Sequence, residues 1–232
     1  TLPLANITQI IPPQPFVEDL LWEGNLDAKL NIERDDDKVD DWRLKLDTTL
    51  SHGRWRHKFD GSQRHETKNG NKIKDEWEAS YDQDYFLTDQ WFLRGSVGTD
   101  RDQFDTVERQ DAVGFGPGYS FWNNALGHFE LIGQLDHYEL QTEDDVYRFE
   151  ASSMQWDYKR LLWGTRFEFV STGEFAAPHV DSIDYVLDSD IGLRYRINEW
   201  ARVSLLYELN QVRGASQTSS DRDYTLGVGV GW

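Results

Sequence analysis

The sequence predicts an all-β protein, a single closed antiparallel transmembrane β-barrel of about twelve strands. Three observations favour this class. Apolar and polar residues alternate along most of the chain, aromatic residues make up 14% of it with ten tryptophans, and segment 224–232 is apolar on one whole face. Successive side chains of a strand point to opposite faces, so the alternation places the two faces in different environments. A membrane barrel needs this division, with lipid outside and a polar interior.

The composition argues against several other classes. The chain has no cysteine, so it forms no disulfide and no cysteine-ligated metal site. Its net charge of −18 argues against nucleic acid as a partner. No apolar run approaches the roughly 18 residues of a membrane helix. The mean hydropathy of −0.72 resembles that of a soluble protein, but a barrel with a polar inner face gives the same average.

The chain divides into two parts. Residues 1–21 contain Pro12, Pro13 and Pro15, which cannot donate hydrogen bonds to a strand ladder. This part is therefore expected to be a periplasmic N-terminal leader or a partial plug. Residues 22–232 are expected to form the transmembrane barrel.

The strands follow in order from Trp22, each with apolar or aromatic residues at alternate positions and polar, turn-forming residues between them. In the first half they are expected over 22–33, 42–50, 55–66, 73–84, 91–102 and 109–122. In the second half they are expected over 129–136, 147–158, 163–169, 184–197, 201–209 and 224–232. A β-bulge is expected near 154–158, where the alternation loses its phase.

The connections are predicted to alternate between short and long, which would give the barrel one trimmed end and one elaborated end. The short set is 52–54, 87–90, 123–127, 159–161 and 198–199. The long set is 34–41, 67–71, 103–108, 140–145, 173–181 and 213–220. The N-terminus and the short turns are expected on the periplasmic side.

Tryptophan provides a second line of evidence, because aromatic residues gather where a barrel meets the membrane interface. Most tryptophans fall near the predicted short turns, and Trp42 and Trp77 are the exceptions. The predicted membrane-interface aromatics are Trp22, Trp55, Trp91, Trp122, Trp163, Trp200 and Trp232.

The opposite phase of the strands carries charges of both signs, which are expected to line the barrel interior. These candidate lumen residues are Lys29, Arg43, Lys45, Asp47, Arg56, Lys58, Lys74, Glu76, Glu78, Arg94, Glu130, Asp136, Arg148, Arg166, Glu168, Asp188, Asp190, Arg194, Arg202 and Glu208. Buried charges must be paired or hydrated. One interpretation is an ion-pair lattice that plugs and stiffens the interior, and the other is a narrow aqueous pore that selects small solutes.

Two glycine-faced strands bear on this choice. Gly114, Gly116 and Gly118 recur at alternate positions in one strand, and Gly227, Gly229 and Gly231 do so in the last. They either leave room for water, a ligand or the leader, or they allow close packing of the inner network.

Resemblance to a known family adds to this interpretation. The segments that carry it are 22–26 (Trp-Glu-Gly-Asn-Leu), 114–119 (Gly-Phe-Gly-Pro-Gly-Tyr) and the alternating strand that ends at Trp232. They resemble the salt-induced outer-membrane proteins, a bacterial family grouped under a domain of unknown function. The resemblance covers the chain from about Trp22 onward, and it implies a single-chain barrel in the outer membrane. The resemblance implies no catalytic residues. The name of the family suggests a response to osmotic or ionic stress.

The function expected from these patterns is a narrow passive outer-membrane channel or a stress-related membrane protein with a charged lumen. No cofactor and no metal site are expected. Its partners are expected to be outer-membrane lipids and lipopolysaccharide, with small solutes or ions as cargo, no nucleic acid, and a monomeric state. A plugged structural barrel without transport is an alternative.

Two further classes are weighed. An outer-membrane enzyme such as a lipid hydrolase needs a nucleophile beside a base. However, the six histidines are scattered and none lies in a recognisable nucleophile motif: His52, His57, His65, His128, His137 and His179. The protein is therefore predicted not to be an enzyme. A soluble β-sandwich is the remaining class, and it would lack an outward aromatic belt.

Overall fold

The computed structural model describes residues 19–34, 38–104, 107–143, 145–163, 166–198, 200–214 and 218–231, with side chains from 38 onward and for 19–30. Twelve strands account for nearly all of these residues. They are β1 (Leu21–Arg34), β2 (Lys38–His52), β3 (Trp55–Lys68), β4 (Asn71–Phe86), β5 (Trp91–Asp102), β6 (Val107–Asn124), β7 (Gly127–Thr142), β8 (Val146–Leu162), β9 (Phe167–Pro178), β10 (Ile183–Arg196), β11 (Ala201–Gly214) and β12 (Thr218–Gly231).

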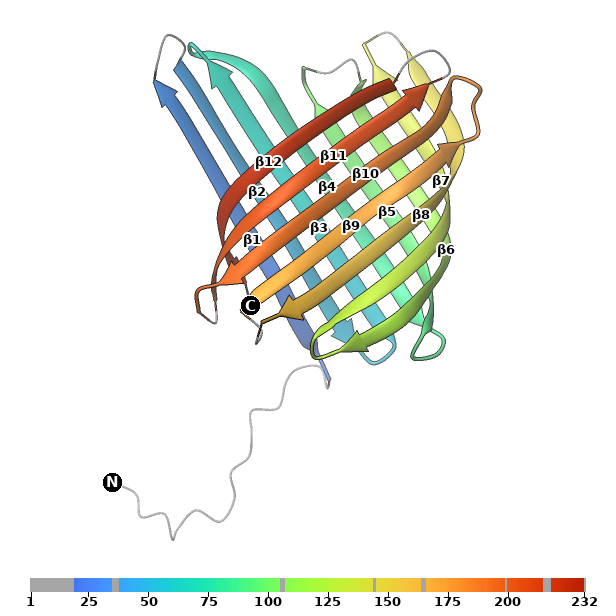
Figure 1. Ribbon diagram of the computed structural model, residues 1–232. Helices are drawn as coiled ribbons and strands as arrows, with labels where there is room; N and C mark the ends of the chain where they lie inside the picture. The colour runs from blue at the N-terminus through green and yellow to red at the C-terminus, as the bar shows by residue number, and fades with distance from the viewer. Residues whose placement is uncertain are drawn as a thin grey trace, which may run out of the picture.

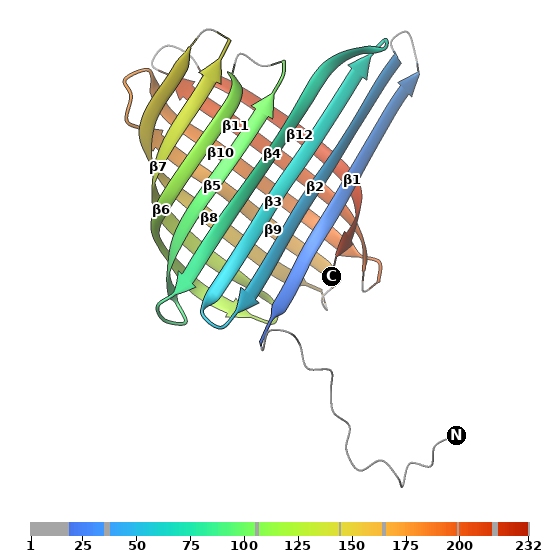
Figure 2. The ribbon, with the colours of Figure 1, turned by 180° about the vertical axis from the view of Figure 1, so that it is seen from behind.

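The strands form one closed barrel in which each pairs antiparallel with its neighbours in the chain, and β12 pairs with β1 (Figures 1 and 2). This confirms the predicted all-β class and the predicted number of strands. Within the described ranges, no helix is long and apolar enough to cross a membrane.

The two faces of the barrel differ as the alternation predicts. On β12, Leu226 and Val228 point outward with 68% and 64% of their surface exposed, while Thr225, which precedes Leu226, points inward and is buried. Large exposed apolar side chains recur around the outer surface, whereas buried charged groups such as Glu130 and Glu168 lie inside. The interior is therefore mainly polar, and the outer face is apolar.

The prediction of one trimmed and one elaborated end is wrong. At the end that holds the start of β1, here called the turn end, the connections span 53–54, 87–90, 125–126, 163–166 and 197–200. At the opposite end, the loop end, they span 35–37, 69–70, 103–106, 143–145, 179–182 and 215–217. The predicted loop 173–181 is largely strand, because β9 continues to Pro178.

The predicted bulge at 154–158 is also wrong. β8 pairs in unbroken register with β7 from Val146 to Arg160, so its residues keep one phase throughout. A register shift occurs instead in β6 between Ser120 and Trp122. This extra residue lets Phe121 and Trp122 both lie exposed on the outer face.

The ladder between β1 and β12 is much shorter than the others. Among the described residues it consists of four pairs, from Asn25↔Gly231 to Ala28↔Val228. β1 pairs with β2 along its whole length, and β12 pairs with β11 from Val230 to Thr218. The two strands therefore diverge toward the loop end (Figures 1 and 2).

Of the predicted leader, only residues 19–21 lie among the described residues, and Leu21 already belongs to β1.

Candidate functional site in the barrel interior

Strands β3, β4, β5, β7 and β8 bring six charged side chains together near the turn end, a group called here the turn-end cluster. Its members are Arg56, Lys58, Asp84, Arg94, Glu130 and Asp157. Arg56 joins two carboxylates that are fully buried: its guanidinium donates to both oxygens of Glu130, at 2.8 and 2.7 Å, and to Asp84 at 2.8 Å. Arg94 donates to the same Asp84 at 2.7 and 2.9 Å. Each buried charge therefore has an opposite charge in contact, as burial requires.

Some of these pairs cross the lumen. Lys58 on β3 donates to Asp157 on β8 at 2.5 Å, although these strands are five positions apart in the ring. His128 Nε2 lies 2.8 Å from the other oxygen of Asp157. The rings of Phe86 and Phe92 lie beneath the Arg56 guanidinium, with centroids 4.9 and 5.1 Å away. The turn-end cluster therefore constricts the interior.

A second set of cross-lumen pairs joins β2 to β10 and β11. Lys45 donates to Asp190 at 2.5 Å and to Glu208 at 3.2 Å. Arg43 forms an ion pair with the same Glu208. Cations on the β2 side are thereby neutralised by carboxylates of the facing strands.

Four inward carboxylates at middle height, contributed by β4, β7, β9 and β10, have no cation within ion-pair distance in the described part of the chain. This acidic sector consists of Glu78, Asp136, Glu174 and Asp188. Ser153 donates to Asp136 at 2.5 Å, and Tyr138 and Gln155 donate to Glu174 at 3.0 and 2.9 Å. Asp188 experiences the negative charges of Asp190, Glu78 and Glu174 and, from beyond ion-pair distance, the positive charge of Lys45. The acidic sector therefore gives this side of the interior a negative potential.

The glycine-faced strands do not open space in the interior. A Cβ atom at Gly118 would collide with the Phe92 ring, and one at Gly231 would collide with Arg202. At Gly229 the obstacle would be the carboxylate of Asp27. The close-packing interpretation of these glycines is therefore supported, and the room that they vacate is filled by inner side chains.

The structure places most of the predicted lumen residues on the inner face. Those that form ion pairs or hydrogen bonds inside the barrel are Arg43, Lys45, Asp47, Arg56, Lys58, Lys74, Glu76, Arg94, Glu130, Asp136, Glu168, Asp190, Arg194, Arg202 and Glu208. Lys29, Glu78 and Asp188 share the inward phase of their strands.

One of the predictions is wrong. Arg148 lies on the outer face, where it donates to Glu139 at 2.7 Å and is largely exposed. It was misplaced because β8 continues past the apolar belt, where water surrounds both faces and the polar face no longer marks the interior. Arg166 lies exposed in the 163–166 connection at the turn end, where its carbonyl accepts a hydrogen bond from the main chain of Arg196, and its place in the lumen stays a prediction.

Sequence reasoning missed several inner groups. Asp157 fell in the segment where a bulge was expected, and Glu174 fell in a predicted loop. Asp84 was overlooked at the end of its strand, although it continues the even-numbered series of Glu76 and Glu78. Every second residue of β4 and of β8 faces the interior without interruption, and this regular alternation could have identified Asp84 and Asp157.

Aromatic side chains form a girdle around the outer face at the turn end. Trp55 contacts Tyr85, Trp91 contacts Tyr119 and Trp122 contacts Phe129, with ring centroids 4.7, 4.9 and 5.1 Å apart. The predicted interface tryptophans are exposed there, namely Trp22, Trp55, Trp91, Trp122, Trp163 and Trp200. Trp232 lies outside the described residues.

Trp42 and Trp77, the two exceptions in the sequence, lie toward the loop end. Each stands nine or ten residues along its strand from the turn end. With about 3.4 Å per residue and a tilt near 40°, this is roughly 25 Å, the height of an outer-membrane apolar band. These two side chains are therefore positioned for the opposite interface.

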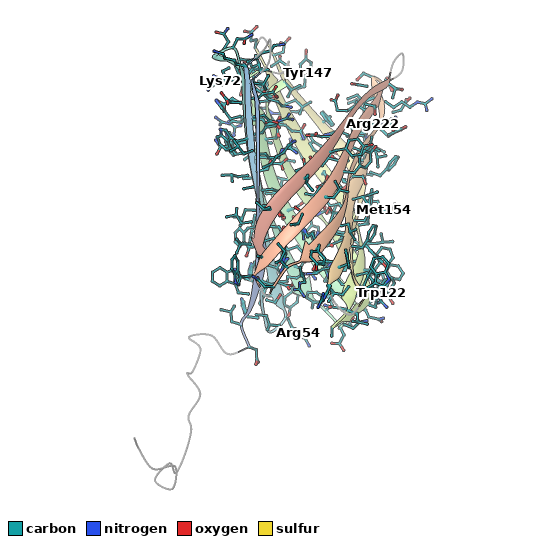
Figure 3. All side chains as sticks on the ribbon, turned by 60° about the vertical axis from the view of Figure 1, so that its left-hand side comes forward. Arg54, Lys72, Trp122, Tyr147, Met154 and Arg222 are labelled. Carbon is teal, nitrogen blue, oxygen red and sulfur yellow. The ribbon has the colours of Figure 1, made fainter. Side chains whose placement is uncertain are left out.

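Charged residues resume on the outer face beyond this level. Lys72, which projects at the loop end in Figure 3, donates to Asp75 at 2.6 Å, and His65 Nδ1 lies 3.3 Å from the same carboxylate. The hydrogen bond from Lys72, assisted by His65, holds the pKa of Asp75 below its usual range. Asp75 therefore stays ionised at neutral pH and adds negative charge to the loop end.

Comparisons with known proteins agree with this architecture. The model of a family described as "Protein of unknown function, DUF481" matches residues 28–232. Among solved structures, the NanC porin aligns with 14% identity over 90% of this chain and 98% of its own, with a TM-score of 0.54. A search of curated proteins found no match.

Two other barrels align less well. The KdgM porin has 9% identity over 90% of this chain and 98% of its own, with a TM-score of 0.48. The translocator domain of the autotransporter NalP from Neisseria meningitidis has 11% identity over 92% of this chain and 87% of its own, with a TM-score of 0.47. At such identities these likenesses concern the fold alone.

Proposed function

The chain belongs to the DUF481 family of proteins of unknown function, and we propose that it is a narrow outer-membrane channel that passes small cations along its acidic sector. The observation that carries the proposal is that Glu78, Asp136, Glu174 and Asp188 face the interior with no cation within ion-pair distance among the described residues. Charged side chains that line a pore select permeating ions by sign. Unpaired carboxylates at one level favour cations over anions.

The outer face supports the location. Apolar side chains cover it between the aromatic girdle at the turn end and Trp42 and Trp77 toward the loop end. Outer-membrane barrels have such a band, flanked by aromatic residues at both interfaces. In this proposal the band contacts membrane lipids, the charged loop end faces lipopolysaccharide, and the barrel acts as a monomer.

The turn-end cluster sets the width of the path. Because Lys58 and Arg56 reach across to Asp157 and Glu130, only small ions and water pass beside them. A passive cation path is also compatible with the osmotic or ionic stress role that the family resemblance implies, and that role stays a prediction.

Reversal potentials in planar bilayers test the proposal. With a tenfold KCl gradient, the purified protein should prefer K⁺ over Cl⁻. Glu174→Gln combined with Asp188→Asn should lower the permeability ratio severalfold, because it removes two of the four charges. Glu139→Gln, a carboxylate on the outer face, is the matched control and should leave the ratio unchanged. Anion preference, or a ratio that the double variant does not alter, would contradict cation passage along this sector.

A structural barrel without transport is the second candidate, favoured by the cross-lumen contact of Lys58 with Asp157. The same bilayers separate the two. If neither the native protein nor Lys58→Ala conducts while both remain folded, the channel proposal is wrong and the structural role stands. Larger conductance in Lys58→Ala than in the native protein supports the channel.

A further inference from the structure

A serine and a histidine meet on the outer face of the barrel, away from the interior. Ser152 lies on β8, and His179 directly follows β9. Ser152 Oγ is 3.0 Å from His179 Nε2, which is hydrogen-bond distance. The main-chain N–H of His179 donates to the carbonyl of Glu150 at 2.7 Å, which fixes the histidine beside β8. Both side chains are exposed.

The pair lies at the boundary between the apolar belt and the polar rim. On β7, Leu135 pairs directly with Ser152, and toward the turn end the next outward neighbours on β8 and β9 are Met154 and Phe175. All three side chains are exposed and apolar. Toward the loop end, the outward neighbours on β8 are Glu150 and Arg148. Met154 projects from the outer side of the barrel between Trp122 at the turn end and Tyr147 at the loop end (Figure 3).

The height of the pair agrees with this boundary. Ser152 stands ten residues from Leu162, the turn-end residue of β8. That separation is roughly 25 Å along the barrel axis, the thickness of the apolar band. The ester groups of membrane lipids lie at this boundary, because they join the acyl chains to the polar headgroups. A lipid beside β8 therefore brings an ester to the level of Ser152.

We propose that Ser152 and His179 form a hydrolytic site that cleaves acyl esters of lipids in the outer leaflet. A serine hydroxyl becomes nucleophilic when an adjacent base within about 2.6–3.2 Å accepts its proton. The observed contact falls within this range. The site is independent of the proposed channel, since it uses the outer face and none of the lumen residues.

The reaction balances without a cofactor. Neutral His179 accepts the Ser152 proton at Nε2 while Oγ attacks the ester carbonyl carbon, which forms a tetrahedral adduct. The adduct collapses, the carbonyl–oxygen bond to the lipid alcohol breaks, and His179 returns the proton to the departing alcohol oxygen. Water then attacks the acyl-serine, with His179 as base, and a free fatty acid leaves as Ser152 regains its proton.

The test measures free fatty acid released by the full chain in vesicles. One arm uses diacyl phosphatidylethanolamine, a second adds lipopolysaccharide with its ester-linked acyl chains, and a third uses an ether-linked phospholipid without esters. Ser152→Ala and His179→Ala should each lower release by at least about 100-fold. Ser189→Ala removes another outward serine, from β10, and should keep the native rate. The ether lipid should release nothing.

The first two arms identify the source of the ester, and either one alone supports the site. A fluorophosphonate probe should label the native protein and Ser189→Ala but not Ser152→Ala, which reports the nucleophile without turnover. Unfolding followed by tryptophan fluorescence verifies that each variant is folded. Equal release by native protein and Ser152→Ala, or no release and no labelling by folded native protein, would overturn the proposal.

Discussion

Arg56 shows how single residues stabilise the interior. Its guanidinium is in contact with Asp84 and Glu130, both with 0% of their surface exposed. A buried carboxylate without a partner costs several kcal/mol, whereas a paired one costs much less. Asp84 has a second partner in Arg94, but Glu130 accepts its hydrogen bonds from Arg56. The two carboxylates therefore depend on Arg56 to different degrees.

Arg56→Ala should lower the free energy of unfolding by about 3–5 kcal/mol, because it leaves Glu130 buried and unpaired. Urea unfolding in detergent, followed by tryptophan fluorescence, measures this loss. Adding Glu130→Gln to Arg56→Ala should restore part of the stability, since the amide carries no charge. Arg148→Ala, which breaks an exposed pair on the outer face, is the control and should leave the midpoint in place. A loss below 1 kcal/mol in Arg56→Ala would show that water compensates for the missing cation.

At the scale of the elements, the ladder between β1 and β12 is the weakest point of the ring. In the part of the chain that the structure describes, four residue pairs close the barrel there, while β10 and β11 pair continuously from Tyr185 to Arg196. Edges without strand partners expose backbone groups that lipid cannot satisfy. Opening of the barrel should therefore begin at this seam.

A disulfide across the seam tests this expectation. Leu26 and Val230 are paired and face outward, and the chain has no cysteine of its own. In Leu26→Cys combined with Val230→Cys, oxidation should raise the free energy of unfolding by about 2–4 kcal/mol over the reduced form. Leu193→Cys with Leu205→Cys crosslinks β10 to β11 and should gain less, because that ladder is already long and the closed loop is short. An equal or smaller gain at the seam would place the weak point elsewhere.

Strand periodicity predicted the elements well where lipid touches the outer face and less well beyond it. On β2, Arg43, Lys45 and Asp47 are inward as predicted, because Leu44 and Leu46 meet the apolar side. Near the loop end of β8 the pattern of apolar residues outside and charged residues inside is reversed. Phe149 stacks on Tyr138, whose hydroxyl donates inward to Glu174. Arg148, in contrast, points outward. Water bathes both faces there, so polarity no longer reports direction.

The partners of the inner charges could not be predicted at all. Lys58 meets Asp157 because the shear of the closed barrel brings β3 and β8 to the same height, and shear is a property of the whole ring. Alternation gives the face of each residue but not its height against a strand five places away. The Ser152–His179 contact was missed for a related reason, since His179 follows a strand that sequence reasoning had ended too early.

At the scale of the whole molecule, the chain carries a net charge of −18, and its interior and loop end are both rich in carboxylates. The Debye length falls from about 10 Å at 0.1 M salt to about 3 Å at 1 M. If the acidic sector selects cations through its potential, raising KCl from 0.1 to 1 M on both sides should lower the K⁺ to Cl⁻ permeability ratio severalfold. Glu174→Gln with Asp188→Asn should start from a lower ratio and change less with salt. At each mean KCl concentration, the K⁺ to Cl⁻ permeability ratio is obtained from the reversal potential under a small KCl gradient. A native ratio that is high and independent of salt would instead mean that ions are selected by direct contact at the turn-end cluster, where screening has little effect.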